Sequence, residues 1–261
     1  MKSALTIAGS DCSGGAGIQA DLKTMLANGV YGMSVITALT AQNTMGVSDI
    51  HDVPSIFVEK EIDSIFTDIV PDAVKIGMVS SSEIIEVISE RMKYYQAKNI
   101  VIDPVMVSTS GSRLLKEEAC VDLERLLFPL GIILTPNIPE AELLSGYTIV
   151  GKADMEKAAR LIASEYHCAV LCKGGHQVET ADDVLCSEDG LEWFLGERIE
   201  NPNTHGTGCT LSSAIATFLA KGFDLRTAVY KSKKYIEGAL RAGLDLGKGV
   251  GPLNHGYRIN E

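Results

Sequence analysis

The amino-acid sequence predicts an α/β fold in which a central, mostly parallel sheet carries helices on both faces. Short apolar runs rich in β-branched residues alternate in regular order with longer helical patterns, and this alternation is typical of parallel sheets. The runs at 73–76 and 100–102 are read as continuous apolar segments, which is the pattern of strands buried on both faces.

Six strands are predicted, each from a short run of apolar residues. In chain order they cover residues 4–8, 33–39, 73–76, 100–102, 132–134 and 169–172. Residues 182–198 differ, because two short runs there flank a turn at 187–190. This pattern predicts a small hairpin at the edge of the sheet.

Eight helices are predicted where apolar residues recur at helical spacing. They cover residues 18–27, 56–67, 83–96, 117–127, 140–144, 155–166, 210–220 and 225–246. Residues 146–153 nearly fit a phosphate-binding P-loop, but Ala153 lacks the hydroxyl that Mg²⁺ needs, so a connecting loop is expected. No linker or internal repeat separates the elements, and residues 1–261 are therefore expected to form a single domain.

Composition excludes several classes of function. The chain has 23 Lys and Arg against 34 Asp and Glu, a net charge of −11 that disfavours binding to a nucleic-acid backbone. No apolar run approaches the roughly 18 residues of a membrane span, and the N-terminal apolar stretch is too short for a signal peptide. The six cysteines form no CxxC pair, which disfavours zinc or redox chemistry. We expect a soluble, cytoplasmic protein that binds neither nucleic acid nor membrane.

The ends of the predicted strands indicate where a ligand lies. In sheets of this kind the ligand sits beyond the carboxyl ends of the strands. The predicted strands run into polar, Gly-rich or Pro-rich turns at 9–17, 40–44, 77–78, 103–106, 135–140 and 173–176. These turns fall at the same edge, and their convergence is stronger evidence for a site than any one motif.

The segment 203–210 carries the strongest single motif. Gly206 and Gly208 open a helix of small residues, so that backbone N–H groups turn inward at a helix N-terminus. Such an arrangement forms an anion hole for a phosphate whose charge grows during transfer. Cys209 lies there too, and the helix dipole is expected to favour its thiolate. The alternative interpretation is a plain helix cap with a buried cysteine.

Four polar side chains at other strand ends suit phosphate chemistry. Asp103 and Glu140 offer hard oxygen ligands, and Asn137 an amide oxygen, of the kind that holds Mg²⁺ largely through water. Lys173 leaves a buried strand before two glycines, which positions a point charge for phosphate. Each could instead be a helix cap, a loop contact or a surface lysine.

A second group of residues suits a flat heterocycle. Gln42 can donate and accept at once, so it can pair with the edge of an aminopyrimidine. Met78 and Val105 could pack on the ring, although core packing is the alternative for both. The Gly-rich loop 9–17 precedes Asp21 on a helix. His176 and His205 lie beside these loops and could serve only to brace a turn.

Together these motifs resemble the hydroxymethylpyrimidine/phosphomethylpyrimidine kinases of the ribokinase-like superfamily. The resemblance covers nearly the whole chain, and the segments 34–44 and 203–210 are its most specific parts. The residues that carry it are 4–11, 13–24, 34–44, 75–78, 103–106, 135–137 with 140–141, 173–176, 203–210 and 247–252. Two positions depart from the usual pattern: Cys12 stands where the family often has Pro, and many superfamily members carry Asp at the position of Cys209.

The resemblance implies a three-layer α/β/α ribokinase-like fold, usually a homodimer, that uses ATP and Mg²⁺. The implied acceptor is 4-amino-5-hydroxymethyl-2-methylpyrimidine, which is phosphorylated once on its hydroxymethyl group and then again to the diphosphate. The residue roles implied by the resemblance fall into four groups. They are Gln42, Asp21, Gly9, Met78 and Val105 for the pyrimidine; Lys173, Thr204, Thr207 and Asn137 for the nucleotide; Asp103 and Glu140 for the metal; and Cys209, Gly208, Gly206 and Lys173 for catalysis.

Two other functions stay open from the sequence. A vitamin B6 kinase of the same superfamily also acts on a hydroxymethyl-bearing heteroaromatic ring, and Gln42 tilts the choice only weakly toward the aminopyrimidine. A pyrimidine-binding regulator on the same fold is the non-enzymatic alternative, and the phosphate-handling residues argue against it. For the kinase we expect Cys209 to act as a base only in the first step, since a phosphate monoester is already largely ionised at neutral pH.

Overall fold

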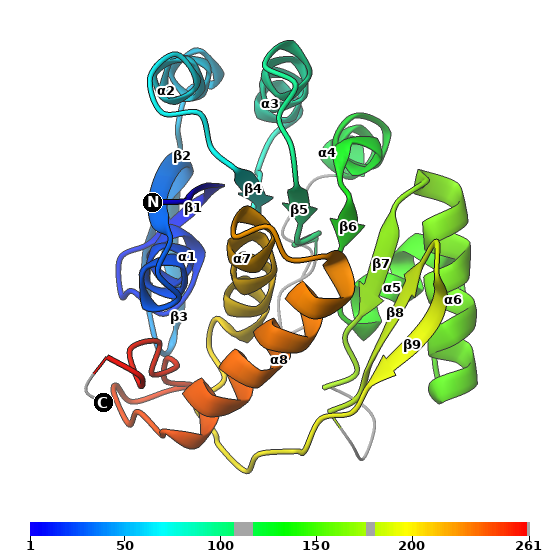
Figure 1. Ribbon diagram of the computed structural model, residues 1–261. Helices are drawn as coiled ribbons and strands as arrows, with labels where there is room; N and C mark the ends of the chain where they lie inside the picture. The colour runs from blue at the N-terminus through cyan, green and yellow to red at the C-terminus, as the bar shows by residue number, and fades with distance from the viewer. Residues whose placement is uncertain (107–116, 176–180, 260–261) are drawn as a thin grey trace.

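The computed structural model of the protein describes residues 1–106, 117–175 and 181–259. In these residues one nine-stranded sheet lies between two layers of helices (Figure 1), as the sequence predicted. The strands, in chain order, are β1 (Ser3–Asp11), β2 (Tyr31–Asn43), β3 (Gly46–Asp52), β4 (Ala73–Ile76), β5 (Ile100–Ile102), β6 (Ile133–Leu134), β7 (Ala169–Cys172), β8 (Asp183–Ser187) and β9 (Gly190–Phe194).

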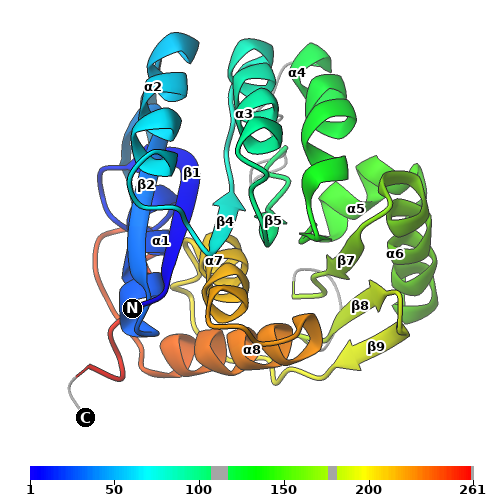
Figure 2. The same cartoon turned by 45° about the horizontal axis from the view of Figure 1, so that its top comes forward.

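The helices divide between the two faces of the sheet (Figures 1 and 2). One layer contains α2 (Ser55–Phe66), α3 (Ser82–Tyr94), α4 (Glu117–Asp122), α5 (Ile138–Ser145) and α6 (Lys152–Tyr166). The other contains α1 (Gly17–Ala27), α7 (Thr207–Ala220) and α8 (Leu225–Arg241). Alternate side chains of a strand enter opposite layers, so Ile100 and Ile102 pack with the first set of helices and Val101 with the second.

The order of the strands places the functional edge. The order across the sheet is β3-β2-β1-β4-β5-β6-β7-β8-β9, and the six central strands β2, β1, β4, β5, β6 and β7 run parallel to one another. The chain goes from β1 to β2 on one side and later returns to β4 on the other. This reversal beside β1 is the position at which sheets of this type bind ligands.

The largest departure from the prediction is strand β3. It pairs antiparallel with β2, so the turn expected after residue 39 is instead a long hairpin with its turn near Gly46, whose φ is 146°. Every residue of β3 is exposed, including Val47 and Ile50, which are each 50% exposed. Without a buried face the strand leaves no alternation in the sequence, and this is why the pattern missed it.

Other boundaries shifted for local reasons. The predicted helix 117–127 divides into α4 and a π-helical turn at Leu123–Leu127. A 3₁₀ turn at Phe128–Leu130, which contains Pro129, follows it. The helix predicted to reach residue 246 ends at Arg241, shortly before Gly243 with φ +55°. The edge hairpin is confirmed as β8 and β9, with Gly190 in its turn.

In the part of the chain that the structure describes, no helix has both the length and the apolar character that crossing a membrane requires. The near-P-loop at 146–153 is a connection, as expected. Gly146 ends α5 in the left-handed conformation and Gly151 precedes α6.

Candidate active site

The ends of β5 and β7 place a buried ion pair at the carboxyl edge of the sheet. Lys173 Nζ lies 2.9 Å from Asp103 Oδ1, and the Thr135 hydroxyl donates to the same oxygen at 3.2 Å. Burial opposes the charge on Asp103, but Lys173 and Lys75 outweigh it and lower the pKa of the carboxyl. The structure therefore keeps a fixed negative and a fixed positive charge side by side, shielded from water.

Glu140 stands beside this pair in the first turn of α5. It forms a capping box with Asn137: Glu140 Oε2 accepts from the Asn137 N–H at 2.8 Å, and Asn137 Oδ1 accepts from the Glu140 N–H at 2.9 Å. Burial and the nearby Asp103 raise the pKa of Glu140 to about 7, against the effect of Lys173. The cap that was the alternative for Asn137 is thus present, and it orients Glu140.

The pair Asp103 and Glu140 fits the Mg²⁺ that the family resemblance implies. Burial is the main cause of the raised pKa of Glu140 and the charge of Asp103 adds to it, and a divalent cation would offset both effects. In the described residues no three His, Cys, Asp or Glu side chains gather into a closed metal site. Such a cation would therefore take ligands from water and nucleotide as well.

The N-terminus of α7 faces the Lys173–Asp103 pair. Gly206 precedes the helix with φ +82°, and a Cβ there would collide with the backbone carbonyl of Gly15. A Cβ on Gly208 would lie 3.4 Å from Lys173 Nζ and 3.5 Å from Asp103 Oδ2. The expected helix N-terminus is therefore next to the buried charges. Thr207 is the first residue of the helix, and Thr204 is exposed just before it.

Cys209 is the third residue of α7, and the Gly17 N–H donates to its sulfur. Burial raises the pKa of this thiol to about 11, even though the charge of Lys75 acts in the opposite direction. The helix position had suggested a favoured thiolate. The structure reverses that direction because loss of water, together with nearby Asp21 and Asp103, outweighs the dipole and the lysine.

Asp21 and Lys75 form a second buried ion pair that the sequence reading missed. Lys75 Nζ lies 2.8 Å from Asp21 Oδ2, and both side chains are fully buried. The Thr6 hydroxyl donates to the same oxygen at 2.6 Å, whereas Asp21 Oδ1 has no hydrogen-bond partner in the described structure. The signal was available, since Lys75 interrupts an otherwise apolar buried strand and a buried lysine needs a carboxylate.

The loop 9–17 is organised by Asp11. Its carboxylate accepts from the backbone N–H groups of Ser13, Gly15 and Ala16 and from the Ser13 hydroxyl. His205 Nε2 lies 2.9 Å from Asp11 Oδ2, so the histidine joins this loop to the segment before α7. His205 does brace a turn, as the sequence allowed, and it also contacts a predicted site residue.

The predicted site residue that His205 contacts is Gln42, near the end of β2. Gln42 Nε2 lies 3.2 Å from His205 Nε2. His205 directly precedes Gly206, which is the residue before α7. Gly9 and Met78 also face each other, because a Cβ on Gly9 would lie 2.6 Å from Met78 Cε. Val105 is half-buried two residues beyond Asp103. The predicted ring residues thus line the same edge as the predicted phosphate residues.

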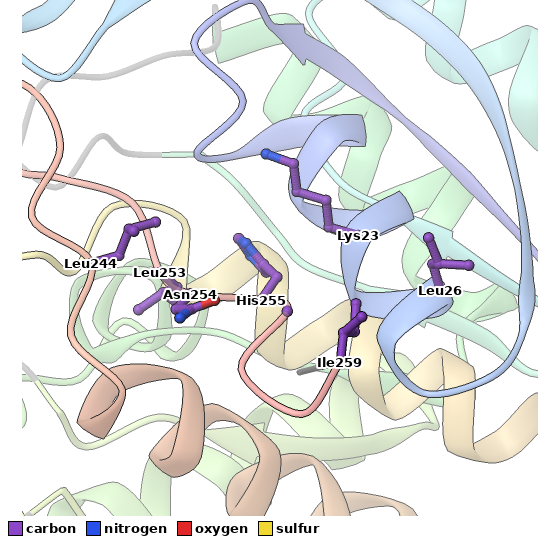
Figure 3. A pocket seen from close by; sticks show the side chains of 8 residues that line it. Lys23, Leu26, Leu244, Leu253, Asn254, His255 and Ile259 are labelled. Atoms are coloured by element: carbon purple, nitrogen blue, oxygen red, sulfur yellow. The ribbon is translucent and has the colours of Figure 1, made fainter. Parts of the chain in front are cut away.

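Two features fall outside this arrangement. His176 lies outside the described residues. A hollow of about 300 Å³ between α1 and the C-terminal tail contains none of the predicted site residues (Figure 3). It is lined mainly by apolar side chains, and His255 at its wall holds Thr210 of α7 through a 2.9 Å contact to the hydroxyl.

Fixed charges shielded from water stabilise the charge that develops as a phosphoryl group moves between oxygens. The residues predicted to contact a heterocycle lie at the same edge, which fits an acceptor of low molecular weight. Fold and site together define the protein as a small-molecule kinase of the ribokinase-like class.

Comparison with known proteins narrows the class. A family model for phosphomethylpyrimidine kinase matches residues 11–254. A hydroxymethylpyrimidine/phosphomethylpyrimidine kinase of Rhizobium meliloti is 49% identical over 98% of this chain and 97% of its own. The thiamine biosynthesis bifunctional protein ThiED of Geobacter sulfurreducens is also 49% identical over 97% of this chain, which spans only 52% of that longer protein.

Solved structures agree. A crystal structure of phosphomethylpyrimidine kinase from Clostridium difficile is 50% identical with a TM-score of 0.83, covering 90% of this chain and 98% of that one. An ADP complex of Bacillus subtilis pyridoxal kinase is 38% identical with a TM-score of 0.93, covering 100% of both chains. The chain belongs to the phosphomethylpyrimidine kinase family, which confirms the resemblance seen in the sequence.

Proposed function

We propose that this protein transfers a phosphoryl group from ATP to the hydroxymethyl group of 4-amino-5-hydroxymethyl-2-methylpyrimidine, and then a second one to the resulting monophosphate. One observation carries the proposal. Gln42 contacts His205, and His205 directly precedes the turn whose helix faces Lys173 and Asp103. A ring held by Gln42 and a phosphate held by α7 therefore share one site.

In this proposal the charged residues handle the phosphates. Lys173 neutralises the transferring group, and the N–H groups after Gly206 and at Gly208 receive its growing negative charge. Thr204, Thr207 and Asn137 line the approach of the nucleotide. Asp103 and Glu140 hold Mg²⁺, which when bound screens the charge of the phosphate oxygens.

The neutral residues handle the acceptor. Gln42 pairs with the aminopyrimidine edge, and Met78 and Val105 pack on the ring beside Gly9. Asp21 acts through its bond to Lys75 and through its Oδ1, which is free to meet a donor. The sequence predicted only a ring contact for Asp21, and its ion pair with Lys75 was not expected.

Cys209 takes the proton of the acceptor hydroxyl in the first step only. A thiol with a pKa of about 11 is protonated at neutral pH, so it must ionise before it can accept that proton. Lys75 and the Gly17 N–H lower the cost of this ionisation. The second acceptor is a phosphate monoester that needs no base, because its second pKa is about 6.

The test is phosphorylation of the pyrimidine by the purified protein with ATP and Mg²⁺, followed by phosphorus NMR. We expect a monophosphate signal followed by a diphosphate. ATP consumption that does not depend on added pyrimidine would contradict the proposal. Phosphate transfer itself excludes the pyrimidine-binding regulator.

The second candidate function is a vitamin B6 kinase, favoured by the similarity to Bacillus subtilis pyridoxal kinase. The same assay with pyridoxal in place of the pyrimidine decides between them. We expect the kcat/KM for the pyrimidine to be the higher of the two, because Gln42 offers a donor beside an acceptor.

We further propose a cytoplasmic homodimer. Half-exposed apolar side chains on the β2–β3 hairpin, Leu39, Val47 and Ile50, support a partner surface. Light scattering after size-exclusion chromatography measures the mass directly, and a mass near that of one chain, 27.9 kDa, would contradict the dimer.

A further inference from the structure

Two hydrogen-bonded groups hold the Gln42 amide from opposite ends. At one end the Thr40 hydroxyl lies 3.1 Å from Gln42 Oε1 and 2.9 Å from the Ser10 carbonyl oxygen. At the other end His205 Nε2 lies 3.2 Å from Gln42 Nε2 and 2.9 Å from Asp11 Oδ2. Thr40 and Gln42 are two residues apart on β2, and their side chains meet although the pairing with β3 shifts register between Ala41 and Gln42.

Counting hydrogens at the Thr40 end decides which part of the amide belongs there. A hydroxyl has a single hydrogen, and the Ser10 carbonyl can only accept. The Thr40 hydrogen therefore goes to Ser10, and its oxygen is left as an acceptor. The group of Gln42 that faces it must then be the NH₂.

The His205 end gives the same answer independently. Burial opposes the charge on Asp11, but hydrogen bonds from His205, Ser13 and Ala16 outweigh it and lower the pKa of the carboxyl. Asp11 is thus an ionised acceptor, and His205 Nε2 must carry a hydrogen to face it at 2.9 Å. This nitrogen has a single hydrogen and no lone pair, so an NH₂ facing it would set donor against donor, whereas a carbonyl oxygen can share the hydrogen that points to Asp11. The group of Gln42 that faces His205 is therefore the carbonyl oxygen.

Both ends demand one orientation of the amide, with its NH₂ toward Thr40 and its oxygen toward His205. We propose that Thr40 and the His205–Asp11 pair are positioning residues that lock this orientation and so make the site specific for a ring with an amino group beside a ring nitrogen. The inference rests on the proposed function, because it assumes that Gln42 meets the acceptor ring.

The locked amide presents its remaining N–H and its remaining lone pair in a fixed order. The aminopyrimidine offers a donor, its amino group, next to an acceptor, its ring nitrogen. Pyridoxal, aligned on the same hydroxymethyl group, offers a formyl oxygen and then a hydroxyl at those places. A buried mismatch of donor with donor is costly, so the fixed order admits the first ring and opposes the second.

Releasing one end of the amide tests the proposal. Thr40→Val keeps the shape of the side chain but removes its hydroxyl, so the amide can turn over. We expect the ratio of kcat/KM for the pyrimidine to that for pyridoxal to fall on the order of tenfold. Both substrates are offered in one tube with ATP and Mg²⁺ and the two phosphorylated products are counted, so the ratio does not depend on how much of the variant is folded.

Two matched variants complete the experiment. Thr40→Ser restores a hydroxyl and should restore the wild-type ratio. Thr217→Val removes another buried threonine hydroxyl, one that bonds only within α7 to the Ser213 carbonyl, and should leave the ratio unchanged. A Thr40→Val ratio equal to the wild-type ratio overturns the lock while leaving the kinase intact. A wild-type protein that does not phosphorylate the pyrimidine overturns the proposed function, and the lock with it.

Discussion

The two halves of the candidate site differ in the kind of side chain that they contain. The phosphate half, around Lys173, Asp103 and Glu140, consists of buried charges that lie at the ends of short parallel strands. The ring half, around Gln42, relies on hydrogen-bonding groups on β2, the longest strand of the described sheet, and on the loop that Asp11 organises. Charges act at a distance and tolerate different acceptors. Hydrogen bonds need a partner in one place and therefore choose among acceptors.

In the proposed function, this contrast assigns transfer to one half and selection to the other. A change in the phosphate half should slow every substrate by a similar factor. A change in the ring half should alter the ratio between substrates.

The largest effect is expected from Lys173→Met. Losing the charge that faces the transferring phosphoryl group should lower kcat/KM by about 10³-fold, close to 4 kcal/mol, in both phosphorylation steps. Steady-state assays of the two steps measure it. Lys152→Met is the control, since it breaks a lysine–aspartate pair of 2.7 Å whose lysine is half-exposed and which contains none of the predicted site residues, and it should change the rate by less than about twofold. A loss of rate confined to one of the two phosphorylation steps would contradict the idea that the phosphate half acts on every substrate alike.

Gly206→Ala should lower the free energy of unfolding by about 3 kcal/mol, because Gly206 lies where the segment before α7 meets the loop 9–17. The added Cβ collides with the Gly15 carbonyl, and the backbone is left-handed at φ +82°. Gly222→Ala is the matched control, because its φ is +86° but nothing lies within 4 Å of the new Cβ, so about 1 kcal/mol is expected. Urea denaturation of both variants gives the free energies of unfolding, and equal losses would refute the close approach.

Cys209→Ala should slow the first phosphorylation by about 10²-fold and the second very little. The reason is that only the alcohol has a proton to lose. Its first-step rate should also stop rising with pH, whereas that of the wild-type protein rises toward the thiol pKa of about 11. Equal losses in both steps would contradict a role as base.

The smallest expected effect is a dependence of the free energy of unfolding on pH that arises from His255, which contacts Thr210 of α7. Burial and nearby Lys23 lower the pKa of His255 to about 4, below its ordinary value of 6.5. Between these values the unfolded chain binds a proton that the folded chain does not, so stability falls as the pH drops. The loss should be about 2 kcal/mol from pH 7 to pH 5, measured by urea denaturation.

His255→Gln should reduce this slope, and replacing the exposed His51 by Gln should leave it unchanged. An identical slope in the His255→Gln variant would show that another group is responsible.

The fold could be predicted from the sequence because its core strands are buried and therefore consist of short runs of apolar residues. Short apolar runs gave β4 and β5, and their carboxyl ends gave the edge at which Asp103 and Lys173 meet. Strand β3 could not be found, because it has no buried face and therefore no period.

The site was predicted by residue type more readily than by environment. Lys173 and Asp103 were expected near each other, but the sequence does not state how much water surrounds a thiol. For Cys209 the helix position suggested one direction of the pKa and burial imposed the other. The network that turns the Gln42 amide depends on partners 30 and 163 residues away in the chain, and no local pattern encodes such distances.

The buried pair of Asp21 and Lys75 has a consequence for how the chain can change over time. Removing either member leaves the other as an isolated charge in an apolar interior, at a cost of about 3 to 5 kcal/mol. Exchanging both for apolar side chains avoids that cost. Substitutions at the two positions are therefore expected to occur together, although one position lies on a helix and the other on a strand, 54 residues apart.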